Sequence, residues 1–324
     1  MKKILILSLI LSLMLPLSSC GRAKPTTYTV VAMDTPLSIT LYGGGSAALV
    51  REAVAIATDI EKKASATLED SEVSLFNAAE ESYAFSPMMV EILTAALTMS
   101  KASGGAYDIT VAPLVTLWNI KGGGPVPSDE AIASALTHVG YEKLALTGNV
   151  LTKSDPALKI DLGSVAKGYA LGKMADFLTE AGAIGIVNFG GNVALVGEKP
   201  DGNPWRVSVR DPFDASGVLG TLTLSGGVVA VSGDYERYFE KDGIRYHHVL
   251  SPFDGKPVRG IHTAAVHSAD PMEADLLSTA LFVLGKEGAE ALYQSGAYDF
   301  SYLLVLEDGK TVTSPNFEAV YTAK

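Results

Sequence analysis

The pattern of apolar and polar positions along the chain predicts helices that alternate irregularly with short strands. Leu49, Ala53, Ile56 and Ile60 recur at helical spacing and predict an amphipathic helix over 47–64. β-Branched residues predict strands over 28–32 and 37–42. Caps, prolines and glycines mark further helices over 86–103, 128–138, 164–181, 271–284 and 286–294, strands over 184–188, 193–196, 205–210, 218–224, 244–250 and 263–267, and hairpins over 144–153 and around 307–309.

This mixed order, with hairpins between helices, predicts an α+β fold with mostly antiparallel strands rather than a doubly wound parallel sheet. No internal repeat and no Pro/Ser-rich linker interrupts residues 28–324, so we expect them to form a single compact catalytic unit. The 324 residues are 48% hydrophobic, which is enough apolar material for a sizeable core.

The first 27 residues read as a targeting segment. Lys2 and Lys3 precede an apolar stretch over 4–17, which predicts a secretory signal peptide over 1–19. The stretch ends in Leu-Ser-Ser-Cys20, which resembles a lipobox; the alternative is an ordinary signal peptide with a chance cysteine. We therefore expect a lipid on Cys20, a tether over 20–27, and a membrane-anchored lipoprotein of the cell envelope that faces the extracytoplasmic side.

Composition excludes several classes of function. The net charge of −11, with no block of lysines or arginines, argues against a nucleic-acid partner. A single cysteine excludes a disulfide framework and any CxxC metal site. The P-loop, GxGxxG, HExxH and GxSxG motifs are all missing from the sequence.

Residues 159–169 have the composition of a phosphate site. Gly163 and Ser164 open a predicted helix, whose N-terminus offers free N–H groups and partial positive charge. Lys167 follows one turn in, and Asp161 precedes the helix, where it would accept hydrogen bonds from a ligand or serve a metal. The alternative is a capped amphipathic helix with a solvated lysine.

Two further clusters carry polar groups in apolar surroundings. Asp275 and Thr279 are four residues apart on one face of a predicted helix, and an oxygen-only pair of this kind suits Mg²⁺. The alternative is a buried Asp–Thr pair that caps another segment. Tyr107 and Asp108 follow two glycines at the mouth of a turn, which also fits a helix end leading into a buried loop.

His247 and His248 are adjacent in a predicted strand. Neighbouring side chains of a strand face opposite sides, so we expect only one of the two histidines to point into a site.

The order of these clusters resembles the ApbE family, the FAD:protein FMN transferases. The resemblance covers nearly all of the chain after the leader. It is carried by the stretches 32–35, 71–77, 105–118, 160–169, 188–192, 232–255 and 274–281.

The resemblance implies that FAD is cleaved at its pyrophosphate, that AMP leaves, and that FMN is joined to a Thr or Ser hydroxyl of a partner redox protein. It implies Mg²⁺ as cofactor and FAD as substrate. The residues that it implies are Ser164, Asp275 and Thr279 for the metal, Met33, Ala106, Tyr107, Asp108, Asp161 and Lys167 for the cofactor, and His248 and Asp161 for catalysis, with His248 as candidate general base.

The chain departs from the family pattern in one place. The usual stretch reads His-Ile-hydrophobic-Asp-Pro-x-Thr-Gly, whereas here Ser251 replaces the Asp and Asp254 replaces the Thr. Because of this exchange, two consequences stay open: a slower turnover, or a different substrate. The exchange also keeps two alternatives in view: an FAD-binding lipoprotein without transferase activity, and an FAD pyrophosphatase that releases FMN and AMP to water. A solute-binding lipoprotein fits the predicted metal and phosphate groups less well.

Overall fold

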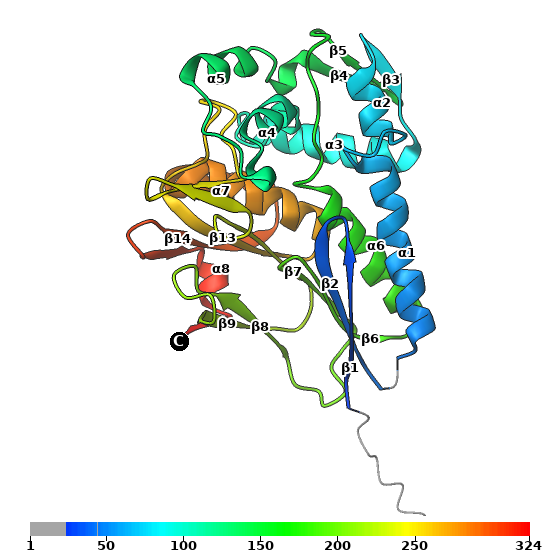
Figure 1. The fold of residues 1–324 in the computed structure, drawn as a ribbon. Helices are drawn as coiled ribbons and strands as arrows, with labels where there is room; N and C mark the ends of the chain where they lie inside the picture. Colours follow the sequence, from blue (N-terminus) through cyan, green and yellow to red (C-terminus); the bar gives the residue numbers. More distant parts are fainter. Residues whose placement is uncertain (1–23, 44) are drawn as a thin grey trace, which may run out of the picture.

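An eight-stranded antiparallel sheet forms the centre of the protein (Figure 1). The computed structural model describes residues 24–43 and 45–324. The strand order is β1-β2-β6-β7-β10-β13-β14-β15. The strands are β1 (Thr26–Ala32), β2 (Thr35–Tyr42), β6 (Ile184–Phe189), β7 (Asn192–Val196), β10 (Val228–Gly233), β13 (Ile261–Ser268), β14 (Phe300–Leu306) and β15 (Thr311–Thr313).

Three long helices cover one face of this sheet. They are α1 (Ala47–Ala64), α6 (Ala166–Glu180) and α7 (Pro271–Gln294), and they lie side by side in this order (Figure 1). Helix α7 packs on β10 and β13. Because side chains alternate along a strand, Val228 and Ala230 join the core under the helices, whereas Val229 points to the opposite face.

A small third layer covers that opposite face. It consists of the sheet β16-β9-β8, with β8 (Trp205–Arg210), β9 (Val218–Leu224) and β16 (Tyr321–Ala323), together with α8 (Pro315–Glu318). Val207 and Leu222 from this sheet and Phe317 from α8 pack against Val229 and Leu303. The middle strands of the main sheet are therefore buried on both faces.

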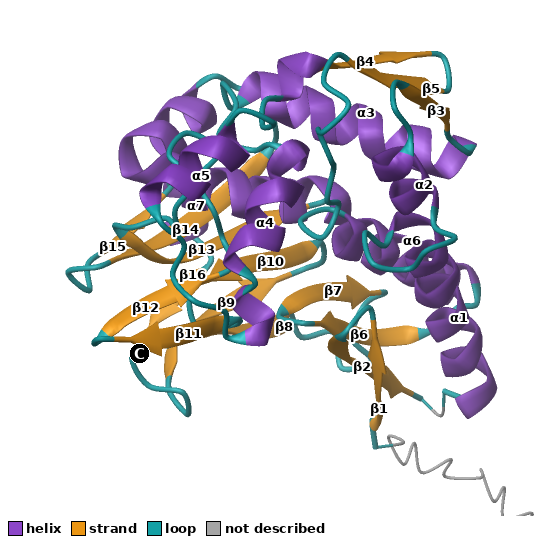
Figure 2. Ribbon diagram, turned by 45° about the horizontal axis from the view of Figure 1, so that its top comes forward, coloured by secondary structure: helices purple, strands orange, loops and turns teal. Residues whose placement is uncertain are grey.

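A mainly helical region lies at one end of the sheet (Figure 2). It contains α2 (Glu72–Ala78), α3 (Pro87–Ala102), α4 (Ala112–Trp118), α5 (Asp129–Leu136), short 3-10 helices at Ile109–Val111, Ile120–Gly122 and Tyr141–Lys143, and the sheet β3-β5-β4 with β3 (Ser82–Ala84), β4 (Leu144–Thr147) and β5 (Val150–Lys153). The hairpin β11 (Tyr238–Lys241) and β12 (Ile244–His247) pairs only with itself among the described strands.

The structure confirms the predicted α+β class with antiparallel strands. It also confirms the break between the two helices predicted near the C-terminus, because Gly285 has φ 68° inside α7 and interrupts the helical backbone there. The closing hairpin forms as predicted between β14 and β15.

Some boundaries differ from the prediction. Helix α6 begins at Ala166 rather than Ser164, because the N–H groups of Val165 and Ala166 both bond the carbonyl of Leu162 in a preceding turn. The strand predicted over 244–250 stops at His247, and β1 starts at Thr26, inside the predicted tether. The sequence prediction also omitted α2, α4, α8, β3, β10, β11 and β16.

The predicted leader over 1–19 and the predicted lipid site Cys20 lie outside the described residues. Among the residues that are described, no helix combines the length and apolarity that crossing a bilayer requires.

Candidate active site

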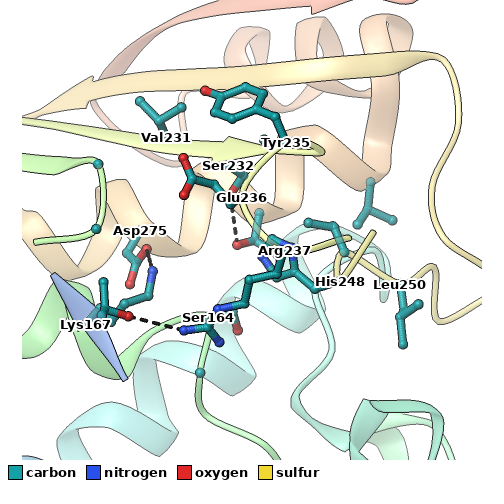
Figure 3. Close-up of a pocket in the computed structure, with 18 of the residues that line it drawn as sticks. Ser164, Lys167, Val231, Ser232, Tyr235, Glu236, Arg237, His248, Leu250 and Asp275 are labelled. Atoms are coloured by element: carbon teal, nitrogen blue, oxygen red, sulfur yellow. Dashed lines mark hydrogen bonds and ion pairs between the residues drawn. The ribbon is translucent and has the colours of Figure 1, made fainter. Parts of the chain in front are cut away.

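A cavity of about 760 Å³ lies where the start of α6, the first half of α7 and the end of β10 meet (Figure 3). This volume falls in the usual range of cofactor and substrate pockets. The predicted site residues that line it are Ala106, Tyr107, Asp108, Asp161, Ser164, Lys167, His248, Asp275 and Thr279. Tertiary structure thus brings together side chains that are up to 173 positions apart in the sequence.

Asp275 lies at the polar side of the cavity and is almost fully buried. Its Oδ2 accepts a hydrogen bond of 2.7 Å from the backbone N–H of Gly168, and its Oδ1 accepts one of 2.8 Å from Nδ2 of Asn192. The ammonium of Lys167 lies 3.9 Å from Oδ1. The carboxylate therefore caps the N-terminus of α6, which is the structural alternative raised above, while it also faces the cavity.

Gly168 allows α6 and α7 to approach this closely. A Cβ at this position would lie 2.5 Å from Cβ of Asp275 and 2.6 Å from the carbonyl oxygen of Pro271. Both distances are shorter than real Cβ contacts, so a side chain here would separate the two helices and move the carboxylate.

Hydroxyl groups line the wall near Asp275. Oγ of Ser164 donates to the phenol oxygen of Tyr107 at 2.9 Å. Burial raises the pKa of Tyr107, so its phenol stays protonated and keeps a hydrogen to donate. On the neighbouring helix, Oγ1 of Thr279 lies 3.4 Å from Oγ of Ser232, so both hydroxyls belong to the same wall.

The two remaining predicted aspartates accept hydrogen bonds mainly from backbone N–H groups. Oδ1 of Asp161 accepts from the N–H of Gly163 at 2.7 Å. Asp108 accepts from the backbone and hydroxyl of Thr110 and from the N–H of Tyr141, all within 2.8 Å. Burial raises the pKa of both carboxyls. Asp108 therefore anchors the loop that carries Tyr107.

The two adjacent histidines face different surroundings, as predicted from strand alternation. His247 is buried against Phe282, and its Nε2 bonds the carbonyl of Val258 at 2.7 Å. His248 instead lines the cavity, where solvent in the cavity still reaches its ring. The cavity walls remove part of the water around the ring, and this desolvation, together with the positive charges of Lys167 and Arg237, lowers the pKa of His248 to about 3. Its imidazole is therefore neutral at physiological pH.

Met33 is not among the residues that line the cavity. It has φ 48° in the tight turn between β1 and β2, and its N–H bonds the carboxylate of Glu61 on α1. Its neighbours Asp34 and Thr35 reach the cavity instead.

The two residues that depart from the family pattern lie off the main cavity. Ser251 and Asp254 line a separate hollow of about 270 Å³ beside Trp118. Oγ of Ser251 accepts from the N–H groups of Phe253 and Asp254, and Oδ1 of Asp254 accepts from the N–H of Lys256. Both side chains thus serve the turn in which they lie.

Two residues of the site were not singled out from the sequence. Asn192 holds Asp275 and also accepts from the N–H of Val231, so it ties β7 to β10 and α7. Arg237 reaches Oγ1 of Thr35 at 3.2 Å across the cavity rim. Both residues lie in stretches that carry the family resemblance. Their position in these stretches was the only signal for them in the sequence.

The fold and the cavity together define an α+β protein with a pocket of cofactor size, and its relatives are transferases. A model of the ApbE family matches residues 33–303. The chain is 32% identical to the FAD:protein FMN transferase of Vibrio cholerae serotype O1, over 92% of this chain and 90% of the relative. It is also 32% identical to the protein of that name from Haemophilus influenzae, with 92% and 88% covered.

Solved structures agree with this result. The ApbE protein of Thermotoga maritima superposes with a TM-score of 0.84 at 32% identity, covering 92% of this chain and 99% of that one. The flavin transferase ApbE of Vibrio cholerae superposes with a TM-score of 0.81 at 30% identity, with the same coverage. The chain belongs to the ApbE family.

Proposed function

We propose that this enzyme transfers FMN from FAD to a Thr or Ser hydroxyl of a partner redox protein and releases AMP. The observation that carries the proposal is the cluster at the start of α6, where a helix N-terminus, Lys167 and Asp275 meet in one cavity. The helix end and the lysine favour the negative charge of a pyrophosphate. The names of the relatives supply the donor and the kind of acceptor.

The donor set fits Mg²⁺. Each oxygen of Asp275 accepts one hydrogen bond and keeps a second lone pair, and the hydroxyls of Ser164 and Thr279 line the same cavity. Mg²⁺ typically takes few protein ligands and keeps waters and phosphate oxygens, which agrees with one carboxylate and two hydroxyls. Bound there, the ion would neutralise charge that develops on the pyrophosphate.

The residues of the chain then have distinct tasks. Lys167 binds phosphate oxygens, and His248 takes the proton of the acceptor hydroxyl as the hydroxyl oxygen attacks the FMN phosphorus. The bond from this phosphorus to the bridging oxygen breaks, and AMP leaves with the electron pair. The negative charge of a pyrophosphate beside Lys167 and Arg237 would partly offset these two positive charges, which help to lower the pKa of His248.

The test is to incubate the purified protein with FAD and Mg²⁺, with and without an acceptor domain from a flavinylated redox protein. The expected result is AMP together with covalent flavin on the acceptor. AMP without modified acceptor would instead establish the pyrophosphatase. Bound FAD without AMP would establish the flavin-binding protein and direct attention to Ser251 and Asp254.

We also propose that the mature protein is a lipoprotein of the cell envelope, anchored through Cys20 and facing the extracytoplasmic side. The basic n-region, the apolar stretch and the position of the chain's single cysteine support this.

A further inference from the structure

We propose that Asp234 is a positioning residue for the transfer reaction, because it clamps the turn that carries Arg237 and supports His248. This inference rests on the function proposed above. Asp234 does not line the cavity, and neither the family resemblance nor the comparisons give it a role.

Asp234 is a buried carboxylate with partners on two different strands. It is 5% exposed and follows the last residue of β10. Its Oδ2 lies 2.7 Å from Nδ1 of His262 on β13, and its Oδ1 lies 3.4 Å from Nη1 of Arg245 on β12. Its own N–H bonds the carbonyl of His262 at 3.1 Å. A buried charge is tolerated only when it is paired in this way.

The link to Arg245 matters because the β11–β12 hairpin has no strand neighbour in the described sheets. A two-stranded hairpin is marginally stable on its own and needs contacts to a larger body. Asp234 supplies one such contact, since it joins Arg245 in the hairpin to His262 in the central sheet.

The turn that Asp234 begins leads directly into the cavity. Tyr235, Glu236 and Arg237 all line it. The carbonyl of Arg237 accepts the backbone N–H of His248 at 3.0 Å, and the guanidinium of Arg237 reaches Thr35 on β2. A shift of the turn therefore moves His248 relative to Lys167 and Asp275, which are held independently on α6 and α7 (Figure 3).

The test compares Asp234→Asn and Asp234→Ala with the wild-type protein, in steady-state transfer of flavin to the acceptor and in FAD binding. We expect Asp234→Ala to lower kcat about ten- to a hundredfold, because small misplacement of a catalytic group is enough for such a loss. We expect the affinity for FAD to fall less than kcat, because Lys167 and Asp275 stay in place. Asp234→Asn keeps the shape and one acceptor oxygen, so we expect it to recover part of kcat.

Arg245→Met is the second arm, because it breaks the hairpin contact and leaves the carboxylate paired with His262. We expect it to lower kcat without loss of FAD affinity. Asp155→Asn is the matched control: Asp155 also pairs with a histidine, His138, at 2.8 Å, but the three residues that follow it do not line the cavity, whereas the three that follow Asp234 do. We expect it to leave kcat unchanged.

Two outcomes would overturn the proposal: an unchanged kcat in Asp234→Ala, or a parallel fall of kcat, FAD affinity and Tm in all Asp234 variants. The second outcome would show a purely structural role. Failure of the proposed function is distinguishable, because then the wild-type protein itself would bind FAD without modifying the acceptor.

Discussion

Asp275 has two tasks at one carboxylate, since it caps α6 and faces the cavity. In Asp275→Asn an NH₂ group replaces one of the two carboxylate oxygens. This group is a donor and cannot accept the hydrogen bond that the oxygen accepted from Gly168 or Asn192. We expect Mg²⁺-dependent release of AMP to fall about 100-fold or more, and the free energy of unfolding to fall by about 1–2 kcal/mol as for a lost helix cap. AMP assays and urea unfolding check both.

Glu273→Gln on the same helix, outside the cavity, is the control and should keep its activity. Full Mg²⁺-dependent activity of Asp275→Asn would remove Asp275 from the proposed metal site.

His248 yields a prediction about pH. A histidine free in water gains a proton as the pH falls through about 6.5, whereas desolvation by the cavity walls and the two nearby cations lower the pKa of His248 to about 3. We therefore expect its imidazole NMR signals to show no titration between pH 7.5 and 5. We also expect that protonation of His248 does not lower kcat/KM between these pH values. Assignment by comparison with His248→Gln makes the measurement specific. A midpoint near 6.5 would contradict the lowered pKa that the cavity walls and the two cations give His248.

At the scale of elements, the crossing of α6 over α7 decides where the site lies. Gly168→Ala should favour the isolated helix by about 1 kcal/mol, but the added Cβ meets Asp275 and the Pro271 carbonyl at less than 3 Å. We expect a net loss of about 1–3 kcal/mol in the free energy of unfolding.

Gly172→Ala, one turn later on the same helix, is the matched control. Its Cβ would meet only ring atoms of Pro271 at 3.4 Å and beyond, so we expect little loss or a small gain. Urea unfolding of both variants measures the difference, and equal stabilities would show that α6 and α7 have room to separate.

At the scale of the whole molecule, the proposed anchor determines where the enzyme meets its acceptor. A lipid attached to Cys20 would hold the domain at a membrane surface without a spanning helix. We expect Cys20→Ala to move the protein from the membrane fraction to the soluble fraction, with flavin transfer in vitro unchanged. Fractionation followed by immunoblotting checks this, and a variant that stays with the membrane would disprove lipidation at Cys20.

The sequence by itself determined much of the local structure. Periodicity and caps predicted α1 and α7 with their residues, since these signals depend on near neighbours only, and Gly285 marked the break in α7. The element order predicted an α+β fold. The motifs also named most of the residues that line the cavity, because phosphate and metal chemistry restricts the residue types that are used.

Only the tertiary structure decided how those residues work together. The pairing of Asp275 with Gly168 and Asn192 joins positions 107 and 83 residues apart, and no local pattern encodes it. The exclusion of Met33 from the cavity lining and the clamp at Asp234 likewise depend on which strands become neighbours. The physical reason is that burial, and with it pKa and hydrogen bonding, is a property of packing between distant segments rather than of the segments themselves.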